Sequence, residues 1–342
     1  MSCLGTLVPQ GPHTLLVPAP PVKLFWAHNN GMGSPFRSFA RCLPLALLVL
    51  LSGCATVLDE DGALAIVPYH ISSTGRIIVA ANINETGPFD FAVDTGASIS
   101  VLLKETVERA GLRHDTANPV LVHGMVGSGR YPTAIIDRLA VGSEAWVGAK
   151  TVVMPGGTKA TTGLDGILGI DFLSRYAVGY SAQEGVIRLY PPPVVAERSY
   201  RGWSSIPLRR LKTSAGPSRL FAIDIEIAGR RLPALLDLGA GANMMNTRAL
   251  RFIGERLRKR HTDKELVGAV EATIVHAELE VGVVKTARLR WANTKFLVAD
   301  IHALEILQLD DRPIAIIGAD FFNRRDFVID FVRSRLLVKM PN

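Results

Sequence analysis

The stretch Phe91-Ala-Val-Asp94-Thr-Gly-Ala-Ser98 decides the fold, because the chain contains its pattern twice. The second version reads Ala234-Leu-Leu-Asp237-Leu-Gly-Ala-Gly241. In each version a short apolar run leads to an aspartate, and a glycine follows two residues later. Apolar runs of this length are typical of buried strands, and glycine adopts backbone conformations that other residues avoid. Each version therefore predicts a buried strand that presents a carboxylate on a tight loop.

A second motif follows each aspartate at a similar distance. Asp94 is followed by Ile167-Leu-Gly169, and Asp237 is followed by Ile316-Ile-Gly318, at separations that differ by only a few positions. Matching features in the same order at near-equal spacing predict two copies of one structural unit. The aspartate after each second motif, Asp171 or Asp320, is interpreted as a helix cap or turn residue.

Short apolar runs, rich in Val and Ile and bounded by turn residues, fill the chain from residue 62 onward. This pattern indicates strands, and only residues 103–112 and 247–259 show helical periodicity. The proline triplet at 191–193 interrupts the pattern, because it favours an extended, unpaired segment. The sequence thus predicts an all-β protein. Its predicted parts are an N-terminal extension with a signal peptide (1–53), a first lobe (62–190), a Pro-rich linker (191–204) and a second lobe (205–342).

The composition excludes several classes of function. Hydrophobic residues make up 48% of the chain and charged residues 20%, which argues against disorder over most of its length. The net charge of +7 includes three basic and no acidic residues within 1–54, so it gives no strong indication of nucleic-acid binding. The eight histidines form no ligand-like motif, and no cysteine follows residue 54. We therefore expect no metal, no cofactor and no nucleic-acid partner.

The N-terminal region carries a predicted targeting signal. Residues 43–51 are apolar but too few to span a bilayer, and Arg37 and Arg41 flank them. Leu51-Ser-Gly-Cys54 then resembles a bacterial lipobox, which implies lipidation of Cys54 and a membrane anchor at the bacterial cell envelope, at the outer membrane facing the periplasm. The alternative is an ordinary signal peptide with an incidental cysteine. Translation is expected to begin at Met32, or else residues 1–31 form a disordered extension.

The two aspartates suggest a specific chemistry if the repeats pack about a pseudo-twofold axis. Asp94 and Asp237 then meet, and two adjacent carboxyl groups share one proton because both cannot easily ionise. The charged member can activate a water molecule, and the protonated member can hydrogen-bond a scissile carbonyl. This chemistry requires no metal and no covalent intermediate.

The first lobe's motifs, Asp94-Thr-Gly-Ala-Ser98 and Ile167-Leu-Gly169, resemble the signature of retropepsin-like aspartic proteases. Two lobes in one chain resemble the pepsin arrangement. The resemblance covers about residues 75–190 and 217–340, and it implies a bilobal pepsin-like fold of two retropepsin-like β-barrel lobes. A polypeptide substrate would bind between them in extended conformation, and the chain would be a monomer with an intramolecular dyad.

The resemblance also implies roles for individual residues. The catalytic residues would be Asp94 and Asp237. Support of the catalytic loops is assigned to Thr95, Gly96, Ala97, Ser98, Leu238 and Gly239. Packing beneath the loops is assigned to Ile167, Leu168, Gly169, Ile316, Ile317 and Gly318. A glycine-rich substrate flap would include Gly124, Gly127, Gly129 and Tyr131, although a plain surface hairpin is the alternative, and residues 267–270 would be its second-lobe equivalent.

The second motif copy departs from the family pattern at Leu238, where the family has Thr or Ser. Leucine cannot form the cross-lobe hydroxyl hydrogen bond expected of Thr95, a loss on the order of 1 kcal/mol. Three hypotheses follow. The protein is an aspartic endopeptidase, or it is a catalytically degenerate peptide-binding lipoprotein, or its first lobe pairs with the first lobe of a second molecule.

Overall fold

The computed structural model describes residues 62–123, 128–158, 161–192, 200, 202–213, 216–254, 258–261, 265–267, 272–322 and 325–340. All of these residues belong to one compact unit. The N-terminal extension, the signal segment and Cys54 lie outside the described residues.

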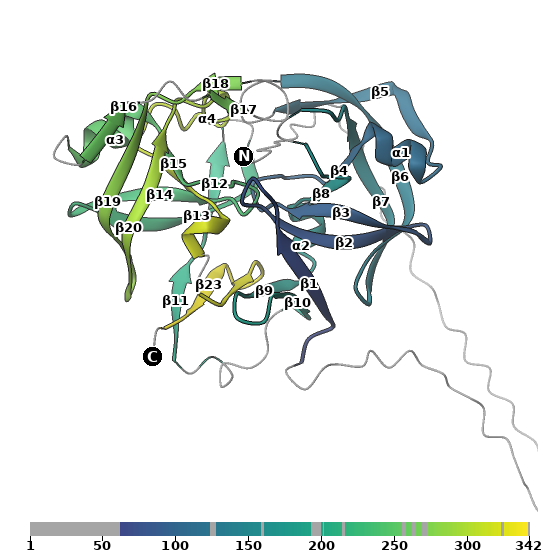
Figure 1. Cartoon of the computed structure of the whole chain (residues 1–342), viewed down its shortest axis with the longest axis horizontal. Coiled ribbons are helices and arrows are strands. Elements are labelled where there is room, and N and C mark those ends of the chain that lie inside the picture. Colours follow the sequence, from purple (N-terminus) through teal and green to yellow (C-terminus); the bar gives the residue numbers. More distant parts are fainter. Residues whose placement is uncertain are drawn as a thin grey trace, which may run out of the picture. The chain divides into compact units, whose positions relative to one another are not determined.

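The first lobe is a closed barrel of six strands (Figure 1). The ring runs β2-β3-β8-β4-β7-β6 and closes because β2 also pairs with β6. The strands of this half are β1 (Ala65–Ile71), β2 (Ile77–Ile83), β3 (Thr86–Val93), β4 (Val101–Leu103), β5 (His114–His123), β6 (Ser128–Val141), β7 (Glu144–Met154) and β8 (Gly166–Leu168). Barrel closure leaves fewer unpaired strand edges and encloses the apolar face.

The second lobe repeats this topology. Its ring runs β13-β14-β21-β15-β20-β19 and closes through the pairing of β13 with β19. The strands are β12 (Arg209–Thr213), β13 (Gly216–Ile227), β14 (Arg230–Leu236), β15 (Met244–Met245), β16 (Arg258–His261), β17 (Glu265–Val267), β18 (Ala272–Ile274), β19 (Ala277–Thr286), β20 (Leu289–Val298) and β21 (Ala315–Ile317). Because the order of pairing is the same in both rings, the two copies detected in the sequence are two copies of one barrel.

A run of antiparallel strands, continuous with the sheet of the first barrel through β1, joins the two halves. Its strands are β9 (Ala177–Ser181), β10 (Val186–Tyr190), β11 (Trp203–Pro207), β22 (Phe327–Asp330) and β23 (Arg335–Lys339). Strand β22 from the end of the second half pairs with β9 from the end of the first, with Phe327 opposite Tyr180. Their rings stack with centroids 4.8 Å apart. The two halves are therefore held together by a shared sheet as well as by direct contact.

Helices are short and few among the described residues: α1 (Lys104–Arg109), α2 (Ile170–Leu173), α3 (Thr247–Ile253), α4 (His302–Ile306) and the 3₁₀ turn η2 (Ala319–Phe322). The predicted helix at 247–259 is wrong in its second half. It begins beside the capping residue Asn246, whose side chain accepts from the Ala249 amide at 2.8 Å, but it ends at Ile253. Gly254 then adopts a positive φ of 93°, a backbone conformation that stops helices. None of the helices described has the length and apolar character needed to cross a membrane.

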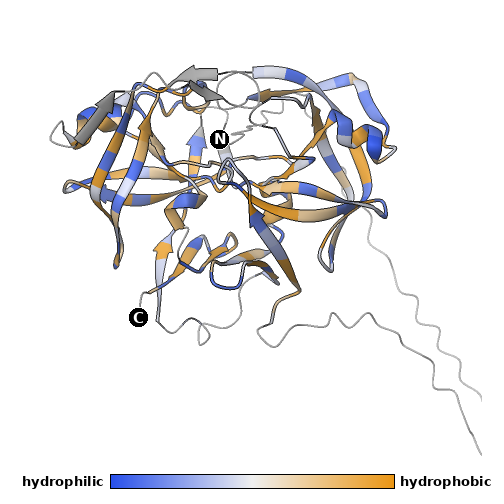
Figure 2. Cartoon of the chain, viewed as in Figure 1, coloured by the Kyte–Doolittle hydropathy of each residue, from blue (hydrophilic) through white to orange (hydrophobic). Residues whose placement is uncertain are grey.

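The apolar core follows from the alternation of residues along the strands. Figure 2 shows hydrophobic and hydrophilic residues alternating along many strands, as expected where one face is buried. In β2, for example, Ile77, Val79, Ala81 and Ile83 are all buried. One large cluster of buried apolar side chains includes residues of both barrels and of the joining sheet. The prediction of an all-β bilobal fold is confirmed.

Candidate active site

The two aspartates occupy equivalent places at the ends of equivalent strands. Asp94 follows the last residue of β3, and its amide donates to Leu168 O of β8 at 3.0 Å. Asp237 follows the last residue of β14, and its amide donates to Ile317 O of β21 at 3.0 Å. In both lobes the strand of the second motif therefore runs parallel to the strand that delivers the carboxylate and holds its end.

The structure brings the two carboxyl groups together in the interior. Asp94 is 1% exposed and Asp237 is 0% exposed. A Cβ atom placed on Gly96 would lie 2.5 Å from Asp237 Cγ, and one placed on Gly239 would overlap the carboxyl group of Asp94. Each loop glycine thus packs directly on the carboxyl group of the opposite lobe. Glycine is required at both positions because a side chain would occupy the space of the aspartates.

Burial is the largest influence on the acidity of Asp94, and it raises the pKa of this carboxyl group well above its ordinary value. The neighbouring carboxyl group of Asp237 raises the pKa further, whereas the positive charge of Arg76 and the Gly96 amide act in the opposite direction. The Gly96 amide donates to Asp94 Oδ1 at 2.7 Å, and the Ala240 amide donates to Asp237 Oδ1 at 3.1 Å. The arrangement suits a carboxyl pair that shares one proton and titrates as a unit.

Thr95 connects the two lobes at the base of this pair. Its hydroxyl donates to Leu236 O at 2.9 Å and accepts from the Leu238 amide at 3.0 Å, and both partners belong to the second lobe. Leu238 is fully buried and packs in the apolar core. Because leucine has no hydroxyl group, its side chain cannot form the equivalent bonds toward the first lobe. At this pair of equivalent positions, only the first lobe provides a hydroxyl group for hydrogen bonds across the lobes.

The second motifs pack beneath the loops that follow Asp94 and Asp237 in both lobes. A Cβ atom on Gly169 would lie 2.6 Å from Ile99 C and 2.9 Å from Ala97 O, and one on Gly318 would overlap Ala240 O. The motif's apolar residues are all buried: Ile167, Leu168, Ile316 and Ile317. Hydrogen bonds reinforce this contact, since the Ile170 amide donates to Ala97 O at 2.8 Å and the Ala319 amide to Ala240 O at 3.2 Å.

Asp171 is not the N-cap of α2, although it lies in the first turn of that helix, in agreement with the alternative interpretation as a turn residue. The N-cap of α2 is Gly169, and it makes no side-chain capping bond. Asp171 instead accepts from the Ser100 amide at 2.8 Å and from the Ser100 hydroxyl at 2.7 Å, and Ser100 Oγ accepts from the Gly169 amide at 3.0 Å. The carboxylate therefore ties the second motif to the segment after the catalytic loop. Asp320 lies in the first turn of η2, in agreement with its interpretation as a turn residue.

Sequence reasoning missed Ser100 and its counterpart Asn243. Both lie at the same offset after the aspartate of their lobe, and Asn243 Oδ1 accepts from the Gly318 amide at 3.0 Å. Both side chains are buried. The shared offset from the aspartate was the available signal, but Ser and Asn differ in type, so the repeat was not apparent.

The predicted flap falls partly on the described residues. Gly129 and Tyr131 lie in β6, opposite Val122 and Val120 of β5, so a hairpin is present at the predicted place. Tyr131 is half-buried and packs on a cluster of buried residues that includes Ala97. Gly124 and Gly127 lie outside the described residues, as do residues 268–270 of the second-lobe equivalent. Of the remaining loop residues, Ala97 and Ser98 are buried.

A comparison with protein families identifies a relationship for the first lobe. Residues 79–175 match the family described as "gag-polyprotein putative aspartyl protease". The first lobe is a retropepsin-like aspartyl protease domain. The matched segment includes the Asp94 loop, the β5–β6 hairpin and the second motif at Gly169. No curated protein matches the chain. The second barrel has the same topology, so the two lobes fit two retropepsin-like units.

A chain of hydrogen bonds links the β5–β6 hairpin of the retropepsin-like first lobe to α4 of the second. Ser128 Oγ lies 2.7 Å from His123 Nδ1 and 3.2 Å from His302 Nε2. His302 Nδ1 in turn lies 3.3 Å from Glu305 Oε2. Burial lowers the pKa of His123, and the charge of His302 lowers it further. We call these four residues the histidine bridge.

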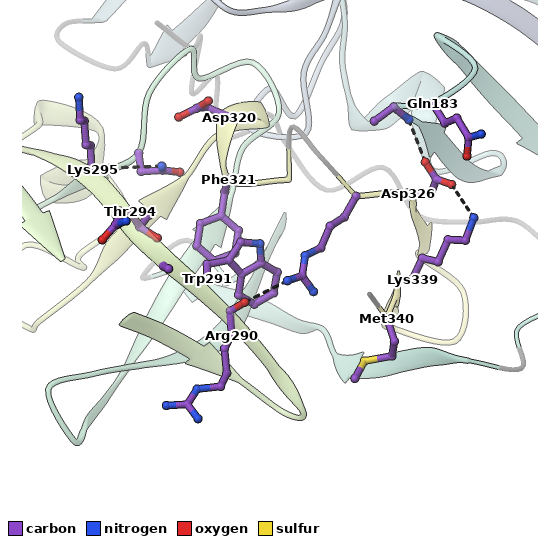
Figure 3. A pocket seen from close by; sticks show the side chains of 15 residues that line it. Gln183, Arg290, Trp291, Thr294, Lys295, Asp320, Phe321, Asp326, Lys339 and Met340 are labelled. Carbon is purple, nitrogen blue, oxygen red and sulfur yellow. Dashed lines mark hydrogen bonds and ion pairs between the residues drawn. The ribbon is translucent and has the colours of Figure 1, made fainter. Parts of the chain in front are cut away.

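A large cavity lies apart from the aspartates of the retropepsin-like lobes. Its volume is about 1210 Å³, and its lining includes neither Asp94 nor Asp237. Figure 3 shows Trp291 and Phe321 side by side in it. Their ring centroids are 4.5 Å apart, and the guanidinium carbon of Arg325 lies 5.0 Å from the centroid of the Trp291 ring. Within the part of the chain that the structure describes, no cluster of three or more His, Cys, Asp or Glu side chains could hold a metal ion.

Proposed function

We propose that the chain is an aspartic endopeptidase that hydrolyses peptide bonds with a water molecule activated between Asp94 and Asp237. The observation that carries this proposal is the reciprocal packing of Gly96 and Gly239 on the two buried carboxyl groups. This packing leaves two acids side by side from two equivalent loops. The raised pKa of Asp94 agrees with a pair that retains one proton.

The reaction would use the two carboxyl groups in different protonation states. The ionised carboxylate removes a proton from a water molecule as the oxygen of that water attacks the carbonyl carbon of the peptide bond. The protonated carboxyl group donates a hydrogen bond to the carbonyl oxygen, and its proton passes to that oxygen in the tetrahedral intermediate. The first carboxyl group then passes its proton to the nitrogen. As the C–N bond breaks, a hydroxyl of the intermediate returns its proton to the second carboxylate, so that an amine and a carboxylic acid leave and the pair regains its single proton.

The substrate in this proposal is a polypeptide in extended conformation, bound by a monomer with its dyad formed within one chain. Support comes from the two equivalent barrels of one chain, which supply one aspartate each. A strand-like substrate could form main-chain hydrogen bonds with the β5–β6 hairpin, with alternate side chains in pockets. We also propose anchoring at the bacterial envelope by a lipid on Cys54, which rests on the sequence of residues 37–54.

A second candidate function is peptide binding without catalysis. The observation that favours it is the buried Leu238, which leaves the cross-lobe hydroxyl contact one-sided. Such a protein would bind an extended peptide between the lobes without cleaving it. The substitution Leu238→Thr separates the two functions, because it would raise the cleavage rate of a weakened catalyst and would leave a degenerate protein inactive.

The test is cleavage of an unfolded protein by the full chain in mild detergent, between about pH 4 and pH 7. Asp94→Asn and Asp237→Asn are compared with Asp311→Asn, a control at an aspartate whose side chain is 71% exposed. We expect cleavage by the parent and the control, and loss of cleavage in both dyad variants.

Other outcomes would overturn parts of the proposal. A folded parent that cleaves at no pH would favour peptide binding. An active Asp237→Asn variant, with a rate that rises with the square of protein concentration, would indicate that the first lobes of two molecules form the dyad.

A further inference from the structure

A buried arginine, Arg76, lies immediately before β2 in the first lobe. Arg76 precedes Asp94 by the same number of positions as Arg219 precedes Asp237. Arg76 is only 2% exposed, whereas Arg219 is exposed. The strand registers differ by one residue, however, because Ile78 lies opposite Ala92 whereas Ala222 lies opposite Leu235. The structural counterpart of Arg76 is therefore the buried Leu220, and the buried cation is specific to the first lobe.

The turn that carries Arg76 reaches the catalytic loop of the opposite lobe. The Ser72 amide donates to Arg76 O at 2.9 Å, and the Arg76 amide donates to Ser72 Oγ at 3.1 Å. These two hydrogen bonds hold the ends of the turn between β1 and β2 together. A Cβ atom on Gly75 would lie 3.0 Å from Gly241 O. Gly75 thus packs against the loop that begins at Asp237. Arg76, the next residue, is placed where the two lobes meet near the aspartate pair.

The charge of Arg76 acts on the dyad. A guanidinium group stays charged at every pH of interest, and a buried charge is costly unless opposite charge compensates it. Its positive charge opposes the effects that raise the pKa of Asp94, and the other titratable group acting on Asp94 is Asp237. The exposed Arg219 acts instead on Asp171, which holds Ser100. Arg76 and Arg219 therefore influence different carboxyl groups.

We propose that Arg76 is a positioning residue that stabilises the single negative charge of the aspartate pair and sets the lower pH limit at which the pair can act as a base. A buried pair that must hold one negative charge benefits from a fixed cation nearby. The catalytic consequence rests on the proposed protease function. The electrostatic effect itself can be measured without any cleavage.

The experiment compares Arg76→Met, Arg76→Lys and Arg219→Met in the full chain. Titration of the Asp94 carboxyl carbon is followed by ¹³C NMR, with its signal identified by its loss in Asp94→Asn. We expect the midpoint to move to higher pH in Arg76→Met, to stay near the parent value in Arg76→Lys, and to be unchanged in Arg219→Met. With a cleaved peptide, kcat/KM of Arg76→Met should fall about tenfold on the acidic limb and recover toward neutral pH.

The outcomes separate this inference from the proposed function. A folded Arg76→Met that titrates as the parent does would overturn the role of Arg76, even if the parent cleaves peptides. A shifted titration in a protein that cleaves nothing would support Arg76 and leave the protease proposal wrong.

Because loss of a buried arginine can unfold a protein, a second measurement uses Arg76→Gln and urea unfolding at about pH 7. The destabilisation by Arg76→Gln is compared in the parent and in a background in which Asp94→Asn and Asp237→Asn remove both acids. If Arg76 compensates the charge of the pair, the loss is smaller in the background without acids. Equal losses in the two backgrounds would contradict the proposal.

Discussion

Thr95 and Leu238 occupy equivalent positions of the repeat, and their difference makes the two halves of the site unequal. The Thr95 hydroxyl makes two hydrogen bonds to the second lobe, while Leu238 contributes apolar packing and its main-chain amide. The lobes are therefore joined at the dyad by one hydroxyl group. Substitution of this group should affect the protein more than substitution of a surface hydroxyl.

At this residue we predict that Thr95→Val destabilises the protein by about 2–4 kcal/mol, because a near-isosteric side chain leaves a buried carbonyl and a buried amide without their partner. The measurement is the free energy of unfolding in urea. Thr162→Val is the control, since the hydroxyl of the exposed Thr162 makes one hydrogen bond, to Thr158 O. It should lose about 1 kcal/mol or less. Similar losses in the two variants would show that the cross-lobe bonds contribute little.

At the scale of elements, the strand pairs β3–β8 and β14–β21 are what place the aspartates. Each strand that carries an aspartate lies beside the strand of its second motif, in parallel, with Val93 opposite Leu168 and Leu236 opposite Ile317. The glycine that follows each second motif lets the chain turn beneath the catalytic loop without a side chain in the way. The position of each aspartate loop therefore depends on its close packing against the glycine of the second motif.

For this element we predict that Gly169→Ala destabilises the protein by roughly 2–3 kcal/mol, the effect of overpacking a tight interior. The added methyl group would displace the backbone at Ala97 and Ile99, which belong to the loop after Asp94. Peptide cleavage should fall with stability. Gly282→Ala is the matched control, because nothing lies within 4 Å of a Cβ atom at Gly282. An unfolding free energy of Gly169→Ala equal to that of the control would refute the packing argument.

Some elements could be predicted from local sequence patterns alone, and others could not. Strand β2 is formed by one of the short apolar runs that indicate strands, and turn residues bound it. The helix expected at 247–259 ended early because Gly254 adopts a positive φ and the chain enters strand β16 soon afterwards. Periodicity alone did not distinguish the apolar residues of a short helix from those of the strand that follows.

At the scale of the whole molecule, the histidine bridge is a pH-sensitive contact between lobes. Because the pKa of His123 is lowered in the folded protein, the unfolded chain binds a proton more readily than the folded one. The contribution of this residue to stability is therefore full above the ordinary histidine value of 6.5 and is lost as the pH falls toward the lowered pKa.

We predict that the parent loses more stability than His123→Gln when the pH is lowered from about 7.5 to about 5, because glutamine does not titrate. Urea unfolding at several pH values measures this difference. His70→Gln, at an exposed histidine, should follow the parent. If the stability of His123→Gln changes with pH as that of the parent does, His123 is not the cause of the loss of stability at low pH.

The sequence by itself determined the two-copy, all-β architecture and the equivalence of Asp94 and Asp237, since local patterns of apolar residues and glycine encode strands, turns and repeats. That the two aspartates meet depended on how the repeats pack. Only the tertiary structure decided that Thr95 bonds Leu236, that Asp171 holds Ser100 and that Arg76 is buried while Arg219 is exposed. These contacts join residues as far as 141 positions apart in the chain. The partner of a buried polar group depends on which distant side chains meet in space, and no local spacing encodes that.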